Sequence, residues 1–267
     1  MSSSTGSISL GASDLIFPDW PQPASVKAFF TTRAGGVSVN TDLADFAGLN
    51  LGRSAGDTPA AIDENRRRVS ALLPCPPKWL NQVHGSRVVV AEEVINLAED
   101  VKADAIAAST PGTPCAIMVA DCLPVLFCDD SGQHAAAAHA GWRGLAAGVL
   151  ENTVAAIHVP PASIMAWLGP AIGPSAFEVG QDVRDAFLSK DKSTAACFIP
   201  RGDAHPDKFF ADIYALARLS LARAGVSRVY GGEFCTVGEP SRFFSYRREG
   251  KVGRKTGRMA GVIWVER

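Results

Sequence analysis

Residues 115–139, CAIMVADCLPVLFCDDSGQHAAAAH, place two apolar runs and an alanine tract one after another, with only short polar breaks between them. The pieces 115–120, 125–128 and 133–139 have the length of strands rather than of helices. Strands that follow one another this closely leave no room for the crossover connection that a parallel pair needs. The stretch therefore favours mixed or antiparallel sheets over a doubly wound parallel sheet.

Further strands are predicted on both sides of this stretch, together with a smaller number of helices. The predicted strands are 27–32, 79–83, 87–90, 103–108, 163–168, 228–234, 242–247 and 259–265, and the predicted helices are 57–73, 144–157, 182–189 and 210–224. In the first helix we expect Arg66, Arg67 and Arg68 to lie mostly away from the apolar face. Because strands outnumber helices, we predict an α+β fold with mixed or antiparallel sheets and helices packed outside.

Composition and charge exclude several classes of protein. The chain has 26 basic and 27 acidic side chains and a net charge of -1, so no overall field attracts nucleic acid or an acidic membrane. No GxGxxG or Walker sequence is present, which disfavours a dinucleotide or P-loop site. We therefore expect a small-molecule ligand, with neither nucleic acid nor membrane as a partner. The sequence carries no indication of oligomeric state.

The organisation along the chain is simple. Residues 1–14 are rich in serine and glycine and are predicted to form a mobile tail, followed by a single domain over residues 15–267. No positive charge precedes Lys27, no apolar run has signal-peptide length, and none reaches the ~20 residues of a membrane span. These features predict a soluble, cytoplasmic protein.

Three short segments carry the residues best suited to chemistry: NQVHG at 81–85, DCLP at 121–124 and HAGWRG at 139–144. They supply His84, Cys122 and His139. Two imidazoles and a thiolate suit Zn²⁺, with an open fourth position, and Cu²⁺ could take its place. The same trio could instead be a Cys-His nucleophile pair with a second histidine. On either reading we expect the donor atoms to converge to within ~4 Å of one another.

Each of these residues taken alone is more typical of a structural histidine or a core cysteine. The surroundings favour function, since Asp121 and Pro124 interrupt the apolar run around Cys122. After His139, two glycines flank Trp142 and Arg143 at a predicted helix start, where an anion such as phosphate can bind.

Motifs spread over most of the chain resemble one known family. They are FFTTR at 29–33, GGVS at 35–38, NLG at 50–52, the three segments above, LGP at 168–170, CT at 235–236, FSYRR at 244–248 and TGR at 256–258. In this order they resemble the YfiH-like family, also called the laccase-domain or multicopper polyphenol oxidase family and, more recently, zinc-dependent purine nucleoside phosphorylases. The resemblance implies layers in the order α/β/β/α and assigns the catalytic or metal-binding trio to His84, Cys122 and His139.

The implied activity is zinc-dependent phosphorolysis of adenosine, inosine, guanosine and methylthioadenosine, together with adenosine deamination. Nucleoside and phosphate would be the small-molecule partners. The resemblance favours substrate or phosphate contacts by Arg143 and, more weakly, by Arg33, Ser38, Asn50 and Arg248. The proton donor to the leaving purine stays open, with Asp104, Asp121 and Glu178 as candidates.

Two other activities remain open at this point. Some bacterial relatives resemble amidases that edit cell-wall precursors, and the fold is similar to that of cysteine deamidases in which a Cys-His pair acts directly. The laccase name implies copper oxidation, but the chain has five histidines and a single His/Cys/His group. One such centre cannot hold the type-1 copper and the trinuclear cluster of a multicopper oxidase, so phenol oxidation with adventitious copper is expected only as a side reaction.

Overall fold

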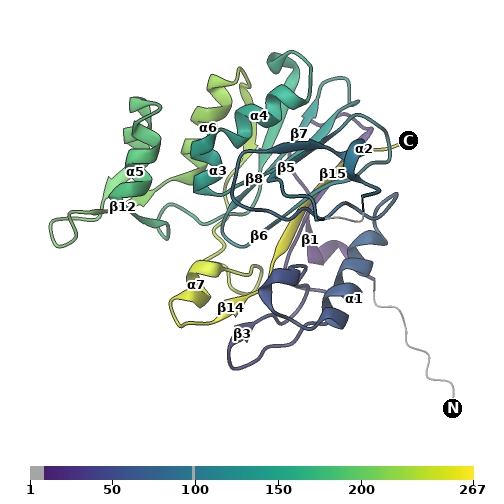
Figure 1. Cartoon of the computed structure of the whole chain (residues 1–267), viewed down its shortest axis with the longest axis horizontal. Coiled ribbons are helices and arrows are strands. Elements are labelled where there is room, and N and C mark those ends of the chain that lie inside the picture. The colour runs from purple at the N-terminus through teal and green to yellow at the C-terminus, as the bar shows by residue number, and fades with distance from the viewer. Residues whose placement is uncertain (1–8, 98–99) are drawn as a thin grey trace.

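The computed structural model describes residues 9–97 and 100–267, and two stacked β-sheets form its centre (Figure 1). The larger sheet has six strands in the order β13 (Arg228–Gly231), β9 (Ile164–Leu168), β7 (Leu123–Asp129), β8 (Ala135–Ala140), β5 (Ala105–Ala108) and β4 (Val88–Val90). The smaller has four, in the order β1 (Leu15–Ile16), β2 (Val26–Thr31), β15 (Met259–Val265) and β6 (Cys115–Val119). The four-stranded sheet is antiparallel throughout, whereas the six-stranded sheet is mixed.

The alternation of side chains along the strands explains why two sheets stack. In β7, Val125 and Phe127 pack against the helices on one face, while Leu126 and Cys128 pack into the layer between the sheets. Strand β15 is also buried on both faces: its residues alternate between the layer shared by the sheets and a third cluster on the outer face of the smaller sheet. Strands buried on both faces read as continuous apolar runs, as these two do.

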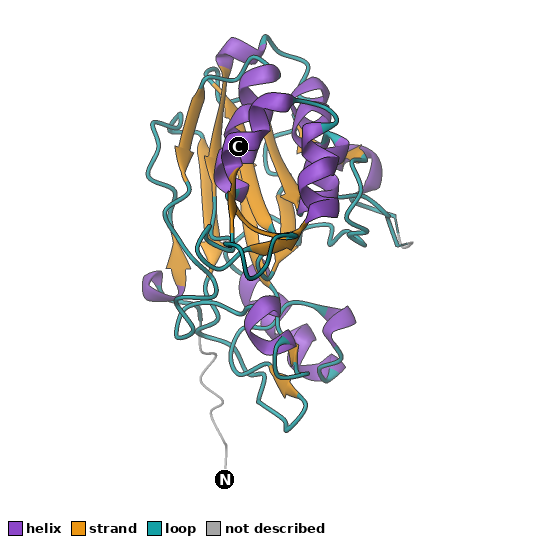
Figure 2. Cartoon of the chain, turned by 90° about the vertical axis from the view of Figure 1, so that its left-hand side faces the viewer, coloured by secondary structure: helices purple, strands orange, loops and turns teal. Residues whose placement is uncertain are grey.

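Helices cover both outer faces. The outer face of the six-stranded sheet carries α4 (Val149–Ala156) and α6 (Ile213–Arg223), whose apolar residues join the strands in one cluster. On the outer face of the four-stranded sheet, Val69 of α1 (Pro59–Ser70) packs in the cluster that contains Val262 of β15. Figure 2 shows the strands stacked beside the helices in the turned view. The predicted α+β class and its α/β/β/α layers are confirmed.

Smaller elements complete the fold, and some of them contribute residues to the wall of the cavity described below. Their members are β10 (Glu178–Gly180), β12 (Lys208–Ala211) and β11 (Phe198–Pro200), the pair β3 (Ala44–Asp45) and β14 (Lys255–Thr256), and the helices α2 (Ala91–Val94), α3 (Trp142–Ala147), α5 (Gln181–Leu188) and α7 (Tyr246–Gly250). Four 3₁₀ turns complete the described part: η1 (Ala12–Asp14), η2 (Arg53–Ala55), η3 (Pro161–Ser163) and η4 (Lys192–Cys197).

The sequence misplaced four elements. Residues 79–83 form only an isolated bridge, between Asn81 and Lys102, and not a strand. Residues 242–247 turn into α7 instead of forming a strand, because the Ser245 side chain accepts a hydrogen bond from the Arg248 amide and begins the helix. The helix over 144–157 is divided at Gly148, whose φ of 96° only glycine adopts readily, and the helix over 210–224 begins three residues late because Asp212 caps it.

The N-terminal segment and α1 also differ from expectation. The expected mobile tail lies outside the described residues over 1–8, and residues 9–14 are not a tail, since Leu10 is buried and η1 follows. In α1, Arg68 is buried against the carbonyl of Gly35 rather than pointing away, and Arg66 stacks over the ring of Trp79. Within residues 9–97 and 100–267, no helix is both long and apolar enough to cross a membrane.

Asn65 joins α1 to the loop that carries the N-terminal motifs. Its side chain is fully buried, accepts from the Val37 amide at 2.9 Å and donates to the Ser38 hydroxyl at 2.9 Å and the Asn50 carbonyl at 2.9 Å. We expect Asn65→Ala to lower the free energy of unfolding by about 2–3 kcal/mol, because buried polar groups lose their partners. Urea denaturation measures this change. The exposed Arg67→Ala on the same helix should cost less than about 0.5 kcal/mol, and equal effects of the two changes would contradict this account.

Candidate active site

His84, Cys122 and His139 meet on the wall of a cavity of about 910 Å³. Strands β7 and β8 pair antiparallel with Leu123 opposite Ala140, so the residue just before β7 and the residue near the end of β8 become neighbours. His84 reaches the same point from the loop before β4. One donor atom from each side chain lies within 4.8 Å of the other two, somewhat wider than the spacing expected from the sequence. The three segments therefore form one site.

Gly141 leaves the space that this site needs. A Cβ atom at this position would lie 2.9 Å from Sγ of Cys122 and 3.1 Å from Cδ2 of His84. Any other residue would push the thiol and the ring apart, so glycine at 141 is a steric requirement of the trio.

Asp104 organises both histidines. Its side chain is fully buried, and Oδ1 lies 2.8 Å from Nδ1 of His139. The same carboxylate accepts the backbone N–H groups of His84 at 2.8 Å and Gly85 at 2.7 Å, with Val83 at 3.2 Å. These bonds hold His84 at a φ of 61°, which is unusual for a residue with a side chain. Since Nδ1 of His139 is engaged, Nε2 is the nitrogen left for the trio.

The charges of the trio reinforce one another. Burial alone would raise the pKa of Cys122, but His139 and His84 outweigh it and bring the thiol pKa well below its ordinary value. Burial alone would lower the pKa of His139, but Cys122 and Asp104 outweigh it and raise that pKa. By contrast, burial raises the pKa of Cys128 to about 12. Cys122 is thus the cysteine that the structure prepares as a thiolate, whereas Cys128 is a core residue.

Asp121, next to Cys122, holds the C-terminal segment against the cavity. Its φ is 85°, and its carboxylate accepts the Thr236 hydroxyl at 2.5 Å, the Ser245 hydroxyl at 3.0 Å and the Arg247 amide at 2.6 Å. These contacts span 115 to 126 residues of sequence. Asp121 is therefore a structural anchor of the site, and its oxygens are already taken by protein donors.

Four arginines line the cavity without a carboxylate ion pair in the described part of the chain: Arg66, Arg143, Arg247 and Arg258. Arg143 is exposed and stacks over the Trp142 ring, with its Cζ 4.5 Å from the centroid. The guanidinium of Arg247 donates to the carbonyls of Ala176 and Glu178. The cavity thus combines the His/Cys/His group with unpaired positive charge, as a site for an anion requires.

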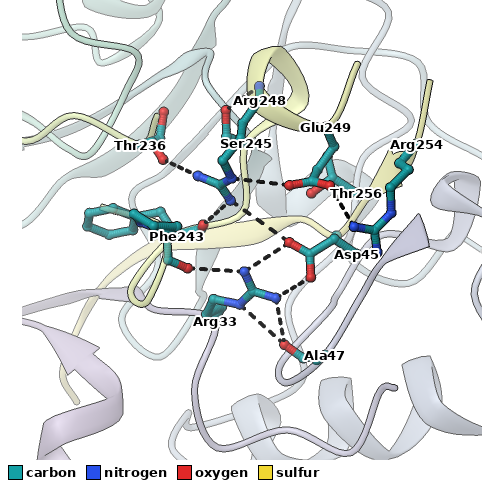
Figure 3. Close-up of polar contacts among 12 residues, drawn as sticks. Arg33, Asp45, Ala47, Thr236, Phe243, Ser245, Arg248, Glu249, Arg254 and Thr256 are labelled. Carbon is teal, nitrogen blue, oxygen red and sulfur yellow. Dashed lines mark hydrogen bonds and ion pairs between the residues drawn. The ribbon is translucent and has the colours of Figure 1, made fainter. Parts of the chain in front are cut away.

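Two arginines expected at the ligand lie elsewhere, in a buried charge network (Figure 3). Arg33 donates to both carboxylate oxygens of Asp45, at 3.0 and 2.5 Å. Arg248 donates to the carbonyls of Thr236 and Phe243, each at 2.9 Å, and neither arginine lines the cavity. The sequence-based expectation of substrate contact by Arg33 and Arg248 therefore finds no support in their positions, because Asp45 and backbone carbonyls occupy their guanidinium groups.

Ser38 and Asn50 are also absent from the cavity wall. The Ser38 hydroxyl is buried and bonded to Asn65. The Asn50 side chain accepts the amides of Gly52 at 3.0 Å and Arg258 at 2.9 Å. Both residues hold loops together, so their expected contact with substrate is not supported by their positions either.

Sequence reasoning gave too little weight to three residues. Asp104 was considered only as a proton donor, although a carboxylate within the apolar stretch VKADAIAA was a signal of a buried partner. Arg258 belongs to the basic segment 242–258, for which the sequence predicts at least one residue at the ligand without saying which, and the structure places Arg247 and Arg258 on the cavity wall. Arg66 was expected to point away from the core, and nothing in its helical position indicated that it would stack on Trp79 at the cavity.

The donor set fits a zinc ion. Tetrahedral zinc with Zn–N near 2.1 Å and Zn–S near 2.3 Å separates its ligand atoms by about 3.4–3.7 Å, so the side chains need to draw together by about 1 Å. The Asp104–His139 hydrogen bond is the carboxylate contact that usually orients a histidine ligand of zinc. All three residues line the cavity, so a fourth position would be open to a ligand there.

Known proteins are similar to this chain over most of its length. The family described as multi-copper polyphenol oxidoreductase laccase matches residues 27–266. Purine nucleoside phosphorylase PA4543 of Pseudomonas aeruginosa is 52% identical over 249 residues, which cover 93% of this chain and 97% of that protein. Purine nucleoside phosphorylase YfiH of Escherichia coli is 51% identical over 259 residues, which cover 95% and 99%.

The crystal structure of NMB0706 from Neisseria meningitidis matches with a TM-score of 0.88 and 52% identity, covering 95% of this chain and 100% of that one. The structure of YlmD from Geobacillus stearothermophilus matches with a TM-score of 0.81 and 30% identity, covering 97% and 99%. The chain therefore belongs to the YfiH family, the family described as multi-copper polyphenol oxidoreductase laccase.

Proposed function

We propose that this protein is a zinc-dependent purine nucleoside phosphorylase. The observation that carries the proposal is the convergence of His84, Cys122 and His139, oriented by Asp104, on a cavity with unpaired arginines. Relatives of about half identity bear the name purine nucleoside phosphorylase. Adenosine, inosine, guanosine and methylthioadenosine are the proposed nucleosides, and inorganic phosphate is the proposed second substrate.

Zinc would be held by the two imidazoles and the thiolate. When bound, it supplies positive charge and an open coordination position beside the substrate. Copper prefers similar donors and would compete for the same place. With five histidines in the chain and a single His/Cys/His group in its described part, oxidation of phenols is proposed only as a side reaction of copper-loaded protein.

In the proposed reaction a phosphate oxygen forms a bond to C1′ of the ribose while the bond from C1′ to the purine nitrogen breaks. The electron pair goes to the purine, and the proton that hydrogen phosphate gives up ends on a purine nitrogen. The products are ribose 1-phosphate and the free base. Arg143, at the cavity wall, would help to neutralise and orient the phosphate. Attack by bound phosphate rather than hydrolysis requires that water be kept away from C1′.

We propose adenosine deamination as a second reaction of the same site. Water would add at C6 of the purine and the amino group would leave as ammonia, so that adenosine and water give inosine and ammonia. The polarising group would be the same His/Cys/His centre, which makes the two reactions depend on the same residues.

A cysteine amidase is the second candidate function. The observation in its favour is the sequence of contacts from Cys122 to His139 to Asp104, since a nucleophile, a base and a carboxylate that orients the base form the usual triad. In that reaction the thiolate would attack an amide carbonyl, such as one in a cell-wall precursor. Metal dependence separates this candidate from the first.

Replacing Cys122 with alanine tests the role of the thiolate. We expect Cys122→Ala to abolish phosphorolysis of inosine and to lower bound zinc well below one equivalent, because the only anionic ligand is lost. The free energy of unfolding should change little, because the protein forms the cavity when it folds, whether or not metal is bound. Elemental analysis and assay of ribose 1-phosphate give the two readings.

A Cys122→Ala protein with full zinc and full phosphorolysis would rule out the proposed site. Chelation provides the control on mechanism. Removal of metal from the wild-type protein should stop the zinc enzyme, whereas a cysteine amidase would survive chelation and lose activity on thiol alkylation.

Replacing Asp104 with asparagine tests the orientation of His139. We expect Asp104→Asn to lower zinc affinity and phosphorolysis by about 10–100-fold, because the carboxylate that fixes the ring and raises its basicity is gone. Competition with a chromophoric chelator measures the affinity. Asp129→Asn is the matched control: Asp129 is also buried but accepts backbone amides at the other end of β7, and should keep both properties. If Asp104→Asn binds zinc with an affinity within twofold of wild type, Asp104 does not orient His139 as a zinc ligand.

A further inference from the structure

Arg258, like Arg247, is held in the cavity wall by backbone carbonyls alone, and one edge of its guanidinium is left free. It lies on the cavity wall with Cys122 and is half-buried. Its Nη1 donates to the carbonyls of Thr256 at 2.8 Å and Gly257 at 3.0 Å. Among residues 9–97 and 100–267, neither its Nε nor its Nη2 has a protein hydrogen-bond partner, and no carboxylate pairs with it. Through its free Nε–Nη2 edge, an arginine can donate two parallel hydrogen bonds to an oxyanion.

The remaining cavity arginines are less suited to hold an anion beside the trio. The guanidinium of Arg247 lies over the Phe177 ring, with its Cζ 5.7 Å from the centroid, and is bonded to carbonyls of the segment 176–178. Arg66 uses its Nε for the carbonyl of Leu51 and stacks on Trp79. Arg143 is exposed, so water screens its charge more strongly than that of a half-buried guanidinium. Arg258, in contrast, is close enough to Cys122 and Asp121 for their charges to act on it.

The backbone of Arg258 is fixed by the N-terminal motif NLG. Its amide donates to Oδ1 of Asn50 at 2.9 Å, and its carbonyl accepts the amide of Leu51 at 3.0 Å. Its stem lies on Gly52, where a Cβ atom would come within 2.6 Å of Cγ of Arg258. Asn50 therefore acts on the cavity by fixing the main chain of Arg258, and not by contact with a ligand.

A second set of contacts fixes the preceding strand. Thr256 pairs with Asp45 between β14 and β3, and the Gly257 amide donates to the Asp45 carbonyl at 3.1 Å. The Asp45 side chain accepts hydrogen bonds from Arg33 and forms an ion pair with Arg248 at 3.9 Å (Figure 3). The buried network thus supports the carbonyls that hold Arg258.

We propose that Arg258 is the principal binding group for the phosphate oxyanion and that Asn50 is its positioning residue. The inference rests on the proposed phosphorolysis and names the residue that would select phosphate as the second substrate. Asn50 acts by holding the main chain of Arg258, so that the guanidinium edge presents its two donors without reorganisation.

The test is phosphate kinetics at saturating inosine, with inorganic phosphate as the varied substrate. For Arg258→Met we expect the KM for phosphate to rise by about 10–100-fold through loss of a charge-assisted pair, with the KM for inosine within about threefold and zinc content unchanged. Arg53→Met is the matched control, because Arg53 also lines the cavity but is paired with Asp63. Its KM for phosphate should stay within about twofold of wild type.

Two further variants and one control keep the test decisive. Arg258→Lys retains the positive charge but loses the pair of parallel N–H donors, so its KM for phosphate should rise several-fold. This variant keeps the test valid if Arg258→Met fails to fold. Asn50→Ala should raise the KM for phosphate more than it lowers kcat. Asp129→Asn, which removes a buried carboxylate far along β7, should lower stability without moving that KM.

The possible outcomes distinguish failure of the proposed phosphorylase activity from failure of the proposed role of Arg258. Absence of ribose 1-phosphate with every purine nucleoside in the wild-type protein would overturn the phosphorylase assignment itself. Phosphorolysis by wild type together with an unchanged KM for phosphate in Arg258→Met and Arg258→Lys would overturn the role of Arg258 alone.

Discussion

The carboxylate of Asp104 is the group on which the site depends. Buried and without access to water, it must be satisfied by protein donors, and it finds them in the ring of His139 and the amides of the loop at 83–85. One oxygen pair thereby fixes a ring orientation on β8 and an unusual backbone conformation at His84. Strain of this kind persists only where surrounding bonds determine it, and here those bonds bring the second imidazole to the first.

A second carboxylate, Asp121, does for one wall of the cavity what Asp104 does for the His/Cys/His group. Its bonds to Thr236, Ser245 and the amide of Arg247 draw a distant segment over the cavity. That segment continues into β14 and β15, where the loop at 44–52 holds it in place. The cavity wall is therefore drawn from distant parts of the chain, including residues 52–54 and residues of the C-terminal segment 246–258.

Periodicity in the sequence predicted the strands that are buried on both faces, since β15 begins and ends where its apolar run does. It failed at 242–247, where RFFSYR resembles a strand but Ser245 begins a helix and Asp121, more than 100 residues away, binds its first turn. A long-range acceptor of this kind leaves no local pattern.

The trio could be found from residue type and position, because few kinds of side chain bind a soft metal. His84, Cys122 and His139 are residues of these kinds, and they lie in glycine-rich segments or in an interrupted apolar run. The arginines could not be sorted in this way. Arg33 and Arg248 belong to motifs as marked as that of Arg258, and only the position of Asp45 shows that the first two are partners of a buried carboxylate. Which cations face the cavity is a property of tertiary structure.

X-ray absorption at the zinc edge of the purified protein tests the central claim most directly. The account predicts one equivalent of zinc with one sulfur at about 2.3 Å, two imidazole nitrogens at about 2.0–2.1 Å and one lighter exchangeable ligand. A spectrum without sulfur, or zinc bound by more than one cysteine, would contradict a centre made of His84, Cys122 and His139.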